Sequence, residues 1–335
     1  MDFDQFLHAH GLVPPAHIVS GKWTRCPTVT HPKKKNGSFK LANDGLIGWC
    51  QNFETGEEVM TWRPEHADAA PKIDHRAIAA KQAEERRQLV KATQAARAYY
   101  ANCKPLIGGH PYLTAHSLRM DGCHGLRVDA DGWMVVPMWR DGNLMSIQRI
   151  SPDGEKKFWY GASAKGAGYM IDRPTATITV VCEGLATGLA VFSAAPLTRV
   201  LVTFNAGNLA NVDLRPRGLT VVASDNDHRT VCRRHKEAGL LSPFEPFAER
   251  PEWCLCNPGL QAAQKAAKAI GCRVATPAGM TGTDWCDWRN EELARRLSLR
   301  DPMSRSPESA LARAVDAEIA ACIARNSVYI QGVRK

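Results

Sequence analysis

The sequence predicts an α/β fold, α+β overall, built around a parallel sheet flanked by helices. Three observations lead to this prediction. From about residue 175, β-branched runs alternate with segments of helical spacing, and short buried strands that alternate with helices form parallel sheets. Before that point, Asp-Gly pairs begin at 131, 141 and 153; they are strong hairpin signals and indicate an antiparallel meander. Residues 1–66 mix Gly, Trp and short alternating apolar stretches, which favours a small β-rich module.

The predicted parallel sheet takes its strands from four apolar runs: 177–182, 199–204, 218–224 and 272–277. Helices are predicted over 185–195 and 257–270, the second with Pro in its first turn. Crossovers between parallel strands are right-handed, and functional groups gather at the carboxyl ends of the strands. We therefore look for the site at that edge of the sheet.

The chain divides into five predicted segments. A stretch rich in Ala, Lys, Arg, Gln and Glu, from about 72 to 104, predicts a long exposed helix that links two modules. A further amphipathic helix is predicted over about 306–325. The segments are 1–66, the small β-rich module; 67–105, the helical linker; 106–174, the meander; 175–297, the parallel sheet; and 298–335, a helical tail.

Composition narrows the class of protein. The 335 residues carry a formal net charge of +9, a surplus that attracts polyanions such as nucleic acids. No apolar run approaches the roughly 20 residues that cross a bilayer, and the first residues carry two acids where a signal peptide carries bases. The cysteines number eleven, an odd count without an export signal, so we read them as reduced thiols. We expect a cytoplasmic protein without a membrane partner.

Three acidic residues follow predicted strands. Glu183 comes directly after 177–182 and precedes Gly184, while Asp225 and Asp227 follow 218–224. Two acids spaced i and i+2 beyond a strand end can both reach one cation, and carboxylate clusters suit Mg²⁺ or Mn²⁺ rather than zinc. Any one of these acids alone is better explained as a solvated residue at a strand end, and only the combination of strand, Glu-Gly, helix, strand, helix, strand and Asp-x-Asp in one sheet is specific.

At these residues the sequence resembles the Toprim domain shared by bacterial-type primases, topoisomerases and some nucleases, and within it the primases of conjugative plasmids and phages. The resemblance runs from about 106 to 290 and more loosely over 20–62. The stretches that carry it are HPYL at 110–113, VVPMW at 135–139, LMSIQRISPDGEKKFWYG at 144–161, CEGLATGLAV at 182–191, FNAGNL at 204–209, ASDNDH at 223–228, NPGLQAAQKAA at 257–267 and GTDWCDW at 282–288.

The resemblance implies roles for the acids and for their neighbours. Glu183 would be the metal-linked acid or base of nucleotidyl transfer, and Asp225 with Asp227 would hold two divalent ions. The family often has an acid where this chain has Asn205, so a third metal contact there is not implied. The candidate cofactor-binding residues are Lys156, Lys157, Lys165, Asn205, Gly207 and Asn208; for the lysines, a solvated hairpin face is an equal alternative.

The amino-terminal segment resembles a zinc-ribbon DNA reader. Its candidate zinc ligands are Cys26, His31 and Cys50, without a Cys-x-x-Cys pair, so a metal-free ribbon-like fold is the stronger of the two predictions. Candidates for stacking on single-stranded DNA or neutralising it are Trp23, Lys33, Lys34, Lys35 and Trp49. The two tryptophans equally suit the core of a small domain.

A second candidate zinc site lies in an apparent insertion between 228 and 257. Its ligands would be Cys232, His235, Cys254 and Cys256, with His228 to spare. Zinc would fix a loop too short and polar to hold a core of its own. The competing interpretation is a set of unrelated free thiols.

Taken together, the sequence predicts a DNA primase-like enzyme that synthesises RNA primers on single-stranded DNA from nucleoside triphosphates with Mg²⁺ or Mn²⁺. The alternatives are a Toprim nuclease, in which the same acids direct water, and a catalytically inactive nucleic-acid-binding module. No G-x-x-x-x-G-K-[ST] phosphate loop occurs, so any unwinding would come from a separate helicase.

Overall fold

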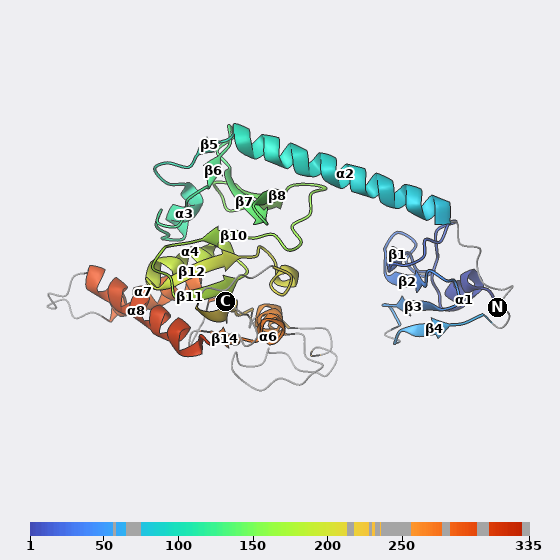
Figure 1. The fold of residues 1–335 in the computed structure, drawn as a ribbon. Helices are drawn as coiled ribbons and strands as arrows, with labels where there is room; N and C mark the ends of the chain where they lie inside the picture. Colours follow the sequence, from blue (N-terminus) through green and yellow to red (C-terminus); the bar gives the residue numbers. More distant parts are fainter. Residues whose placement is uncertain are drawn as a thin grey trace. The chain divides into compact units, whose positions relative to one another are not determined.

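The computed structural model describes residues 1–55, 58–64, 75–212, 218–227, 230–231, 235, 256–276, 282–299 and 308–329. The chain forms two compact units, Met1–Gln88 and Leu89–Lys335, and each is described by itself (Figure 1). The boundary falls within helix α2 (His75–Asn102), inside the stretch that the sequence predicts as a linking helix.

The first unit packs helix α1 (Phe3–Ala9) on an antiparallel sheet. Within the described residues the strand order is β1 (Thr24–Cys26), β2 (Gly37–Leu41), β3 (Gly48–Asn52) and β4 (Met60–Trp62). Asp2 and Gln5 form a reciprocal capping box that starts α1. The core gathers Phe3, Phe39 and Trp62 with their apolar neighbours, so one face of the sheet is covered by α1.

The other face of this sheet carries polar and aromatic side chains. Trp49 is half-buried and lies under the Lys40 ammonium, whose Nζ is 5.6 Å from the ring centroid. Arg25 covers the ring of Phe53 at 4.2 Å. Trp23 is 48% exposed. Neither Trp23 nor Trp49 belongs to the core cluster, which favours the stacking interpretation of the two tryptophans over the core interpretation.

The carboxyl-terminal part of α2 packs on a meander in the second unit. Thr93 and Ala96 are buried, and Arg97 Nε donates to the carbonyl of Leu144 at 2.8 Å. The Tyr99 hydroxyl donates to Asp129 at 2.6 Å. Residues 79–91 of the same helix are exposed, as their Ala, Lys, Arg and Glu content predicts.

The meander is antiparallel, as the Asp-Gly turns predict. Its order is β5 (Lys104–Pro105), β6 (Arg127–Val128), β7 (Met134–Arg140), β8 (Asn143–Ile150) and β9 (Lys156–Phe158), with the short helix α3 (Pro111–Ala115) between β5 and β6. At the β7–β8 turn, Asp141 and Gly142 both have positive φ, 50° and 74°. Such a turn matches the right-handed twist of the strands it joins.

The second sheet of this unit is largely parallel, which confirms the predicted fold class. Its order is β10 (Tyr169–Ile171), β12 (Thr198–Val202), β11 (Ile178–Cys182), β13 (Leu219–Ala223) and β14 (Arg273–Ala275). Only β10 pairs antiparallel, at one edge, with β12. All five residues of β11 and of β12 are buried, as expected for strands covered on both faces.

Helices cover both faces of this sheet (Figure 1). One face, which includes Val180 and Val221, packs against α4 (Leu185–Ala194), α7 (Trp285–Ser298) and α8 (Glu308–Asn326). The opposite face, with Val181 and Val222, packs against α6 (Pro258–Ile270).

Helix α8 differs from its predicted role as a tail. Val315, Ile319 and Ile323 are buried in the same core cluster as the sheet, and Asp316 pairs with Arg289 of α7 at 2.6 Å. The amphipathic pattern predicts that this segment is a helix. It does not predict that the apolar face of the helix packs on α4, α7 and the sheet. No helix in the described ranges has the length and apolar character of a membrane span.

Candidate active site: a carboxylate cluster at the sheet edge

The acids predicted from the sequence lie on neighbouring parallel strands. Val181 of β11 pairs with Val222 of β13, so the two strands end side by side. Glu183 follows β11, and Asp225 and Asp227 follow β13. Their carboxylates interact electrostatically: the charge of Asp227 raises the pKa of Glu183, and the charges of Glu183 and Asp227 raise that of Asp225. The structure therefore brings the three predicted residues to one edge.

Glu183 is partly buried and is held by the segment that follows β12. Its pKa is raised mainly by burial and next by the charge of Asp227, while a hydrogen bond from the Ala206 amide and the charge of Lys156 oppose the rise. The amide of Phe204, a residue with φ of 71°, donates to the Glu183 carbonyl at 2.8 Å. Both the backbone and the side chain of Glu183 are thus fixed by the 204–206 turn.

Asp225 is the most strongly perturbed acid of the cluster. Burial raises its pKa well above the ordinary value, and the charges of Asp284, Glu183 and Asp227 raise it further. Thr187 of α4 opposes this by donating its hydroxyl to Asp225 Oδ1 at 3.1 Å. A carboxylate surrounded by other carboxylates gains the most from a bound cation.

Asp227 is oriented by the first turn of α6. The amide of Gly259 donates to Asp227 Oδ2 at 2.9 Å. A Cβ at position 259 would lie 2.9 Å from that oxygen and 3.1 Å from the Asp225 Cβ, so glycine allows the helix to approach both acids. Asn257 supports the turn: its Oδ1 accepts from the Leu260 amide, and its Nδ2 donates to Asn226 at 2.6 Å.

A fourth acid, Asp284, was not among the predicted site residues. It caps the N-terminus of α7 by accepting from the amides of Cys286 and Asp287, and its pKa is raised by burial. Its charge raises the pKa of Asp225, so it belongs to the same cluster. The segment GTDWCDW contains it, but Asp284 does not directly follow the predicted strand 272–277, so the strand pattern did not single it out.

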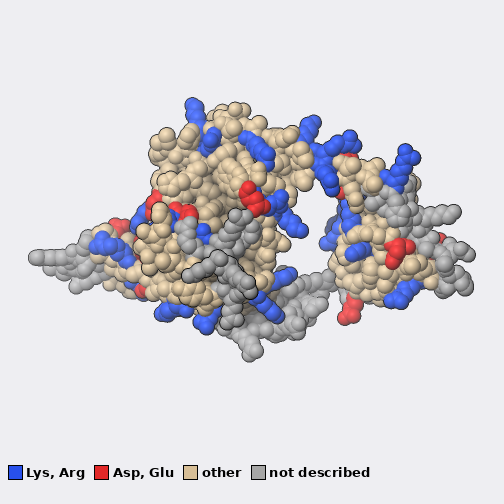
Figure 2. Space-filling view, in the orientation of Figure 1, with Lys and Arg blue, Asp and Glu red and all other residues tan. Residues whose placement is uncertain are grey.

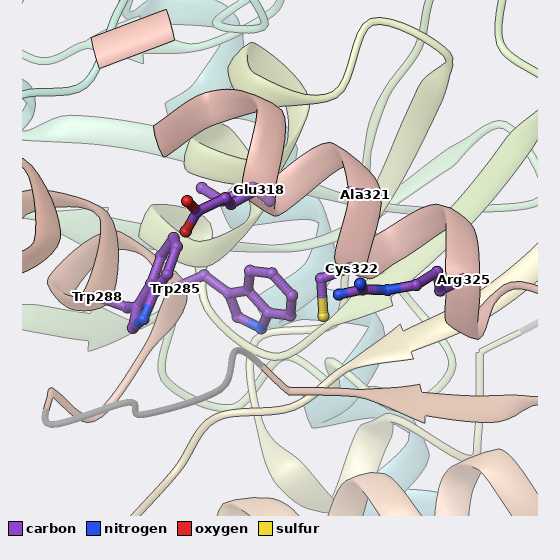
Figure 3. Close-up of a pocket in the computed structure, with 7 residues that line it drawn as sticks. Trp285, Trp288, Glu318, Ala321, Cys322 and Arg325 are labelled. Atoms are coloured by element: carbon purple, nitrogen blue, oxygen red, sulfur yellow. The ribbon is translucent and has the colours of Figure 1, made fainter. Parts of the chain in front are cut away.

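The residue after Asp284 links α7 to the site. The indole Nε1 of Trp285 donates to the carbonyl of Ser224, the residue before Asp225, at 3.0 Å. Figure 3 shows the fully buried Trp285 ring pointing toward Cys322 of α8, in a pocket of about 300 Å³ that Trp288 and Arg325 also line. Asp225 and Asp284 are therefore joined through one buried side chain.

The donor set of this cluster suits a hard divalent cation. It consists of carboxylate oxygens, and burial raises the pKa of Glu183, Asp225 and Asp284. The charge of Lys156 opposes this rise at Glu183 and Asp284. No three His, Cys, Asp or Glu side chains among the described residues are arranged tightly enough to hold one ion. The residues fit Mg²⁺ or Mn²⁺ in kind, while ion binding itself stays a proposal.

Of the three candidate lysines, Lys156 is the one whose charge reaches the cluster. It stands over the Tyr112 ring at 5.5 Å, and its charge acts on Glu183 and Asp284. Lys157 is the next residue along β9; it pairs with Glu155 at 3.0 Å and lies over the Trp133 ring. Lys165 is exposed, and its carbonyl accepts from Arg140 at 3.0 Å.

Asn208, in the loop after β12, was predicted to bind a cofactor, but its side chain is used within the protein. This side chain is buried; its Oδ1 accepts from the Gly166 amide at 2.8 Å, and its Nδ2 donates to the carbonyls of Ala167 and Thr203. Because the amide is used within the protein, Asn208 fixes the 164–167 loop to the sheet instead of facing a ligand. Asn205 precedes the short 3-10 helix η2 (Ala206–Asn208), and the Gly207 carbonyl accepts from Asn211.

The structure does not assemble the first predicted zinc site. Cys26 and Cys50 are buried in the core of the first unit, and burial raises the pKa of Cys26 to about 11. His31 is exposed and pairs with Glu54, with 2.8 Å between Nδ1 and Oε1. The carboxylate of Glu54 also accepts from Thr28 and Asn36 at 2.7 Å and from Thr30. His31 therefore has a carboxylate partner, while the two cysteines lie in the apolar core.

The second predicted zinc site is half described. His235 and Cys256 are both buried, with 3.1 Å between Nδ1 and Sγ. Cys232 and Cys254 lie outside the described residues, as does His228. Zinc binding here stays a prediction.

Comparison with known proteins yields distant relatives. No family model matches the chain. Two curated proteins of Escherichia coli, both named DNA primase TraC, are 28% identical over 280 residues and 25% identical over 285 residues. Each match covers 78% of this chain, but the chain spans only 24% and 18% of the relatives' length. Sequence similarity therefore connects this chain with part of proteins named as primases.

Similarity to solved structures is weak. The primase fragment of the bacteriophage T7 primase-helicase protein gives a TM-score of 0.36 at 14% identity, covering 83% of this chain and 99% of that one. A bacteriophage T7 lagging-strand DNA polymerase complex with primase domains gives 0.34 at 15% identity, covering 59% and 90%. Likeness at this level says nothing about activity.

Proposed function

We propose that this chain is a DNA primase that synthesises short RNA primers on single-stranded DNA by divalent-metal-dependent nucleotidyl transfer. The observation that carries the proposal is the cluster of Glu183, Asp225, Asp227 and Asp284, whose charges act on one another at the carboxyl edge of a parallel sheet. The relatives named DNA primase support the choice of reaction.

The proposed reaction joins two nucleotides. The 3′-oxygen of one attacks the α-phosphorus of a nucleoside triphosphate, its proton is lost, and the bond to the bridging oxygen breaks so that pyrophosphate leaves. Bound Mg²⁺ or Mn²⁺ would lower the pKa of the attacking hydroxyl and neutralise the departing pyrophosphate. Glu183, Asp225 and Asp227 are the residues that would hold the ions.

The chain's own groups prepare the site for this step. Thr187 and the Gly259 amide fix the orientations of Asp225 and Asp227 before substrate arrives. Glu183, with its raised pKa, is suited to accept the hydroxyl proton. Lys156, whose charge acts on the cluster, is suited to pair with the triphosphate, which brings the opposite charge.

The template would be bound by basic surface. The charge of +9 and the Lys and Arg side chains over both units favour binding of a polyanion (Figure 2). In the first unit, the sheet face with Arg25, Lys40 and Trp49 combines cations with aromatic rings, the combination that binds single-stranded nucleic acids.

One assay separates the candidate functions. The full chain is incubated with single-stranded DNA, labelled ribonucleotides and Mg²⁺ or Mn²⁺. New oligoribonucleotides are expected. Cut template would instead indicate a nuclease, and DNA binding without either product would indicate an inactive module.

The same assay tests the role of Asp225. Asp225→Asn, which keeps the shape of the side chain, is expected to lower synthesis by about 100-fold or more while DNA affinity is kept. Glu308→Gln, an exposed acid in α8, is the matched control, and synthesis retained in Asp225→Asn would contradict the proposal.

A further inference from the structure

A second pocket lies beside the edge strand β10, outside the carboxylate cluster. It has a volume of about 420 Å³, in the range of small-ligand sites. Trp139, Arg140 and Asp141 from the β7–β8 hairpin, Gly166 and Gly168 before β10, and Arg199 from β12 are among the residues that line it. None of these is among the predicted site residues.

Trp139 is presented to this pocket by an irregularity in β7. Residues 134–138 of the strand are buried, but the register with β8 shifts between Met138 and Trp139, so that Trp139 and Arg140 are both exposed. A bulge of this kind redirects side chains. The Trp139 backbone exchanges two hydrogen bonds with Gly168, at 2.8 and 2.9 Å, and its ring makes an edge-to-face contact with Tyr100. The indole is held in place while 40% of the residue stays exposed.

Two arginines line the pocket together with this indole. Arg140 Nη1 donates to the Lys165 carbonyl at 3.0 Å, which fixes the side chain beside the 164–168 segment. Arg199 is buried, and its Nε donates to Thr179 Oγ1 at 3.0 Å. His124 adds a further basic group, against one acid, Asp141. A fixed aromatic face next to guanidinium groups suits a planar ring that carries an anionic group.

The part of the pocket that holds Trp139 and Gly168 lies at the end of the sheet where the carboxylate cluster lies. Tyr169 of β10 pairs with Val202 of β12, and Val202 pairs with Cys182 of β11. Glu183 follows Cys182, and Gly168, the partner of Trp139, precedes Tyr169. Two strand spacings separate β10 from β11, roughly 10 Å. Asn208 joins the segment before β10 to the end of β12 by hydrogen bonds to Gly166 and Thr203.

We propose that this pocket binds a nucleobase and its phosphate from the single-stranded DNA, with the base stacked on Trp139 and the phosphate on Arg140. The inference rests on the proposed function and extends it, since it assigns a place for the strand next to the carboxylates. A free nucleoside triphosphate has the same ring and anion, and the experiment distinguishes the two sources.

The first test measures affinity. Binding of a fluorescein-labelled thymidine oligonucleotide to the full chain is followed by anisotropy for Trp139→Ala, Trp139→Phe and the wild type. Loss of one stacked base corresponds to a Kd about 5-fold to 100-fold weaker for Trp139→Ala, and Trp139→Phe is expected to restore most of the affinity. Tyr329→Ala removes an aromatic ring that is 75% exposed elsewhere in the same unit and should leave Kd unchanged. Equal Kd values for Trp139→Ala and wild type, with melting temperatures matched, would overturn the proposal.

The second test locates the strand. An oligonucleotide carrying 5-iododeoxyuridine is crosslinked by light to the full chain, and the modified peptide is identified by mass spectrometry. A crosslink at Trp139 that persists with excess ATP is expected. A crosslink that ATP abolishes would assign the pocket to a free nucleotide, and crosslinks confined to other residues would overturn the proposal.

The two proposals fail in different ways. The crosslink is repeated with Asp225→Asn, which should retain it because stacking needs no carboxylate. A wild-type chain that crosslinks at Trp139 but makes no primers would overturn the proposed function and keep the pocket. Primer synthesis without a crosslink at Trp139 would keep the function and overturn the pocket.

Discussion

At the residue scale, the orientation of the acids depends on one glycine. Gly259 donates its amide to Asp227, and the absence of a side chain lets α6 approach Asp225 and Asp227. In helices alanine is otherwise more favourable than glycine. Replacing Gly259 by alanine would favour the helix but would hinder its approach to the two acids. We therefore expect the substitution to lower activity far more than it changes stability.

Gly259→Ala should therefore impair catalysis more than folding. The added Cβ, 2.9 Å from Asp227 Oδ2, would displace the carboxylates, and a shift of this size is expected to lower primer synthesis by about 10-fold or more. Thermal unfolding should change by only a few degrees. Gln264→Ala, an exposed position of the same helix, is the control. Primer synthesis at the wild-type rate in Gly259→Ala would show that the approach of α6 is not needed.

The stability of the first unit is expected to depend on the ionisation of Glu54 at acid pH. Hydrogen bonds from Thr30 and Asn36 are the main causes that lower its pKa from 4.5 to about 2. Burial opposes this fall, while a hydrogen bond from Thr28 and the charge of His31 add to it. Because the pKa in the folded state lies below that of the unfolded chain, the stabilisation is fully present above pH 4.5 and is lost as the pH falls toward 2.

Thermal unfolding of wild type and Glu54→Gln at several pH values measures this dependence. The variant is expected to unfold at lower temperature at neutral pH, and the difference from wild type should shrink between about pH 4.5 and 2. Glu292→Gln, which removes the Arg295 and Arg296 partner in the second unit, serves as the comparison because its pKa is also lowered to about 2. A difference between wild type and Glu54→Gln that is constant over this range would contradict the assignment.

At the scale of elements, strands position the acids and the segments after them set their orientation. β11 and β13 bring Glu183 and Asp225 together, but the Ala206 amide, Thr187 of α4 and the N-terminus of α6 decide where the carboxylates point. These contacts come from elements far apart in the sequence. Substitutions in the supporting elements are therefore expected to change activity without touching an acid.

The remaining zinc prediction concerns the segment between 228 and 257, which precedes α6 in the sequence. Purified protein is expected to hold about one equivalent of zinc, because His235 and Cys256 lie within 3.1 Å and two further cysteines, Cys232 and Cys254, are near in sequence. Cys254→Ser and Cys256→Ser should lower the zinc content below about a tenth of an equivalent, and Cys272→Ser should not. Wild-type protein with less than a tenth of an equivalent would leave only the free-thiol interpretation.

At the scale of the whole molecule, the surplus positive charge should make DNA binding depend on salt. Each phosphate neutralised on a single strand contributes a slope of about −0.7 in log K against log salt concentration. Replacing Lys33, Lys34 and Lys35 together by Gln is expected to reduce the slope by up to about 2. Titrations between about 50 and 200 mM salt measure it. A slope unchanged in the triple variant would exclude these lysines from the DNA contact.

The sequence by itself determined the fold class, the strands that precede Glu183, Asp225 and Asp227, and the antiparallel meander with its Asp-Gly turns. These features depend on local patterns: β-branched runs, helical spacing and Asp-Gly pairs, whose consequences extend over a few residues. Such patterns could not predict the structural role of Asn208 or the place of Asp284 in the cluster. Most hydrogen-bond partners of the Asn208 side chain lie far from it in the sequence, as does Asp225 from Asp284, the N-cap of α7.

Only the tertiary structure decided what surrounds the acids. Asp284 joins the cluster because α7 packs against α4 on the face that α8 also covers, and Trp139 meets Arg199 because β10 adds to the edge of the sheet. The physical reason is range: a pattern of apolar residues specifies which face of an element is buried, whereas the partner that buries it is selected by the packing of the whole unit.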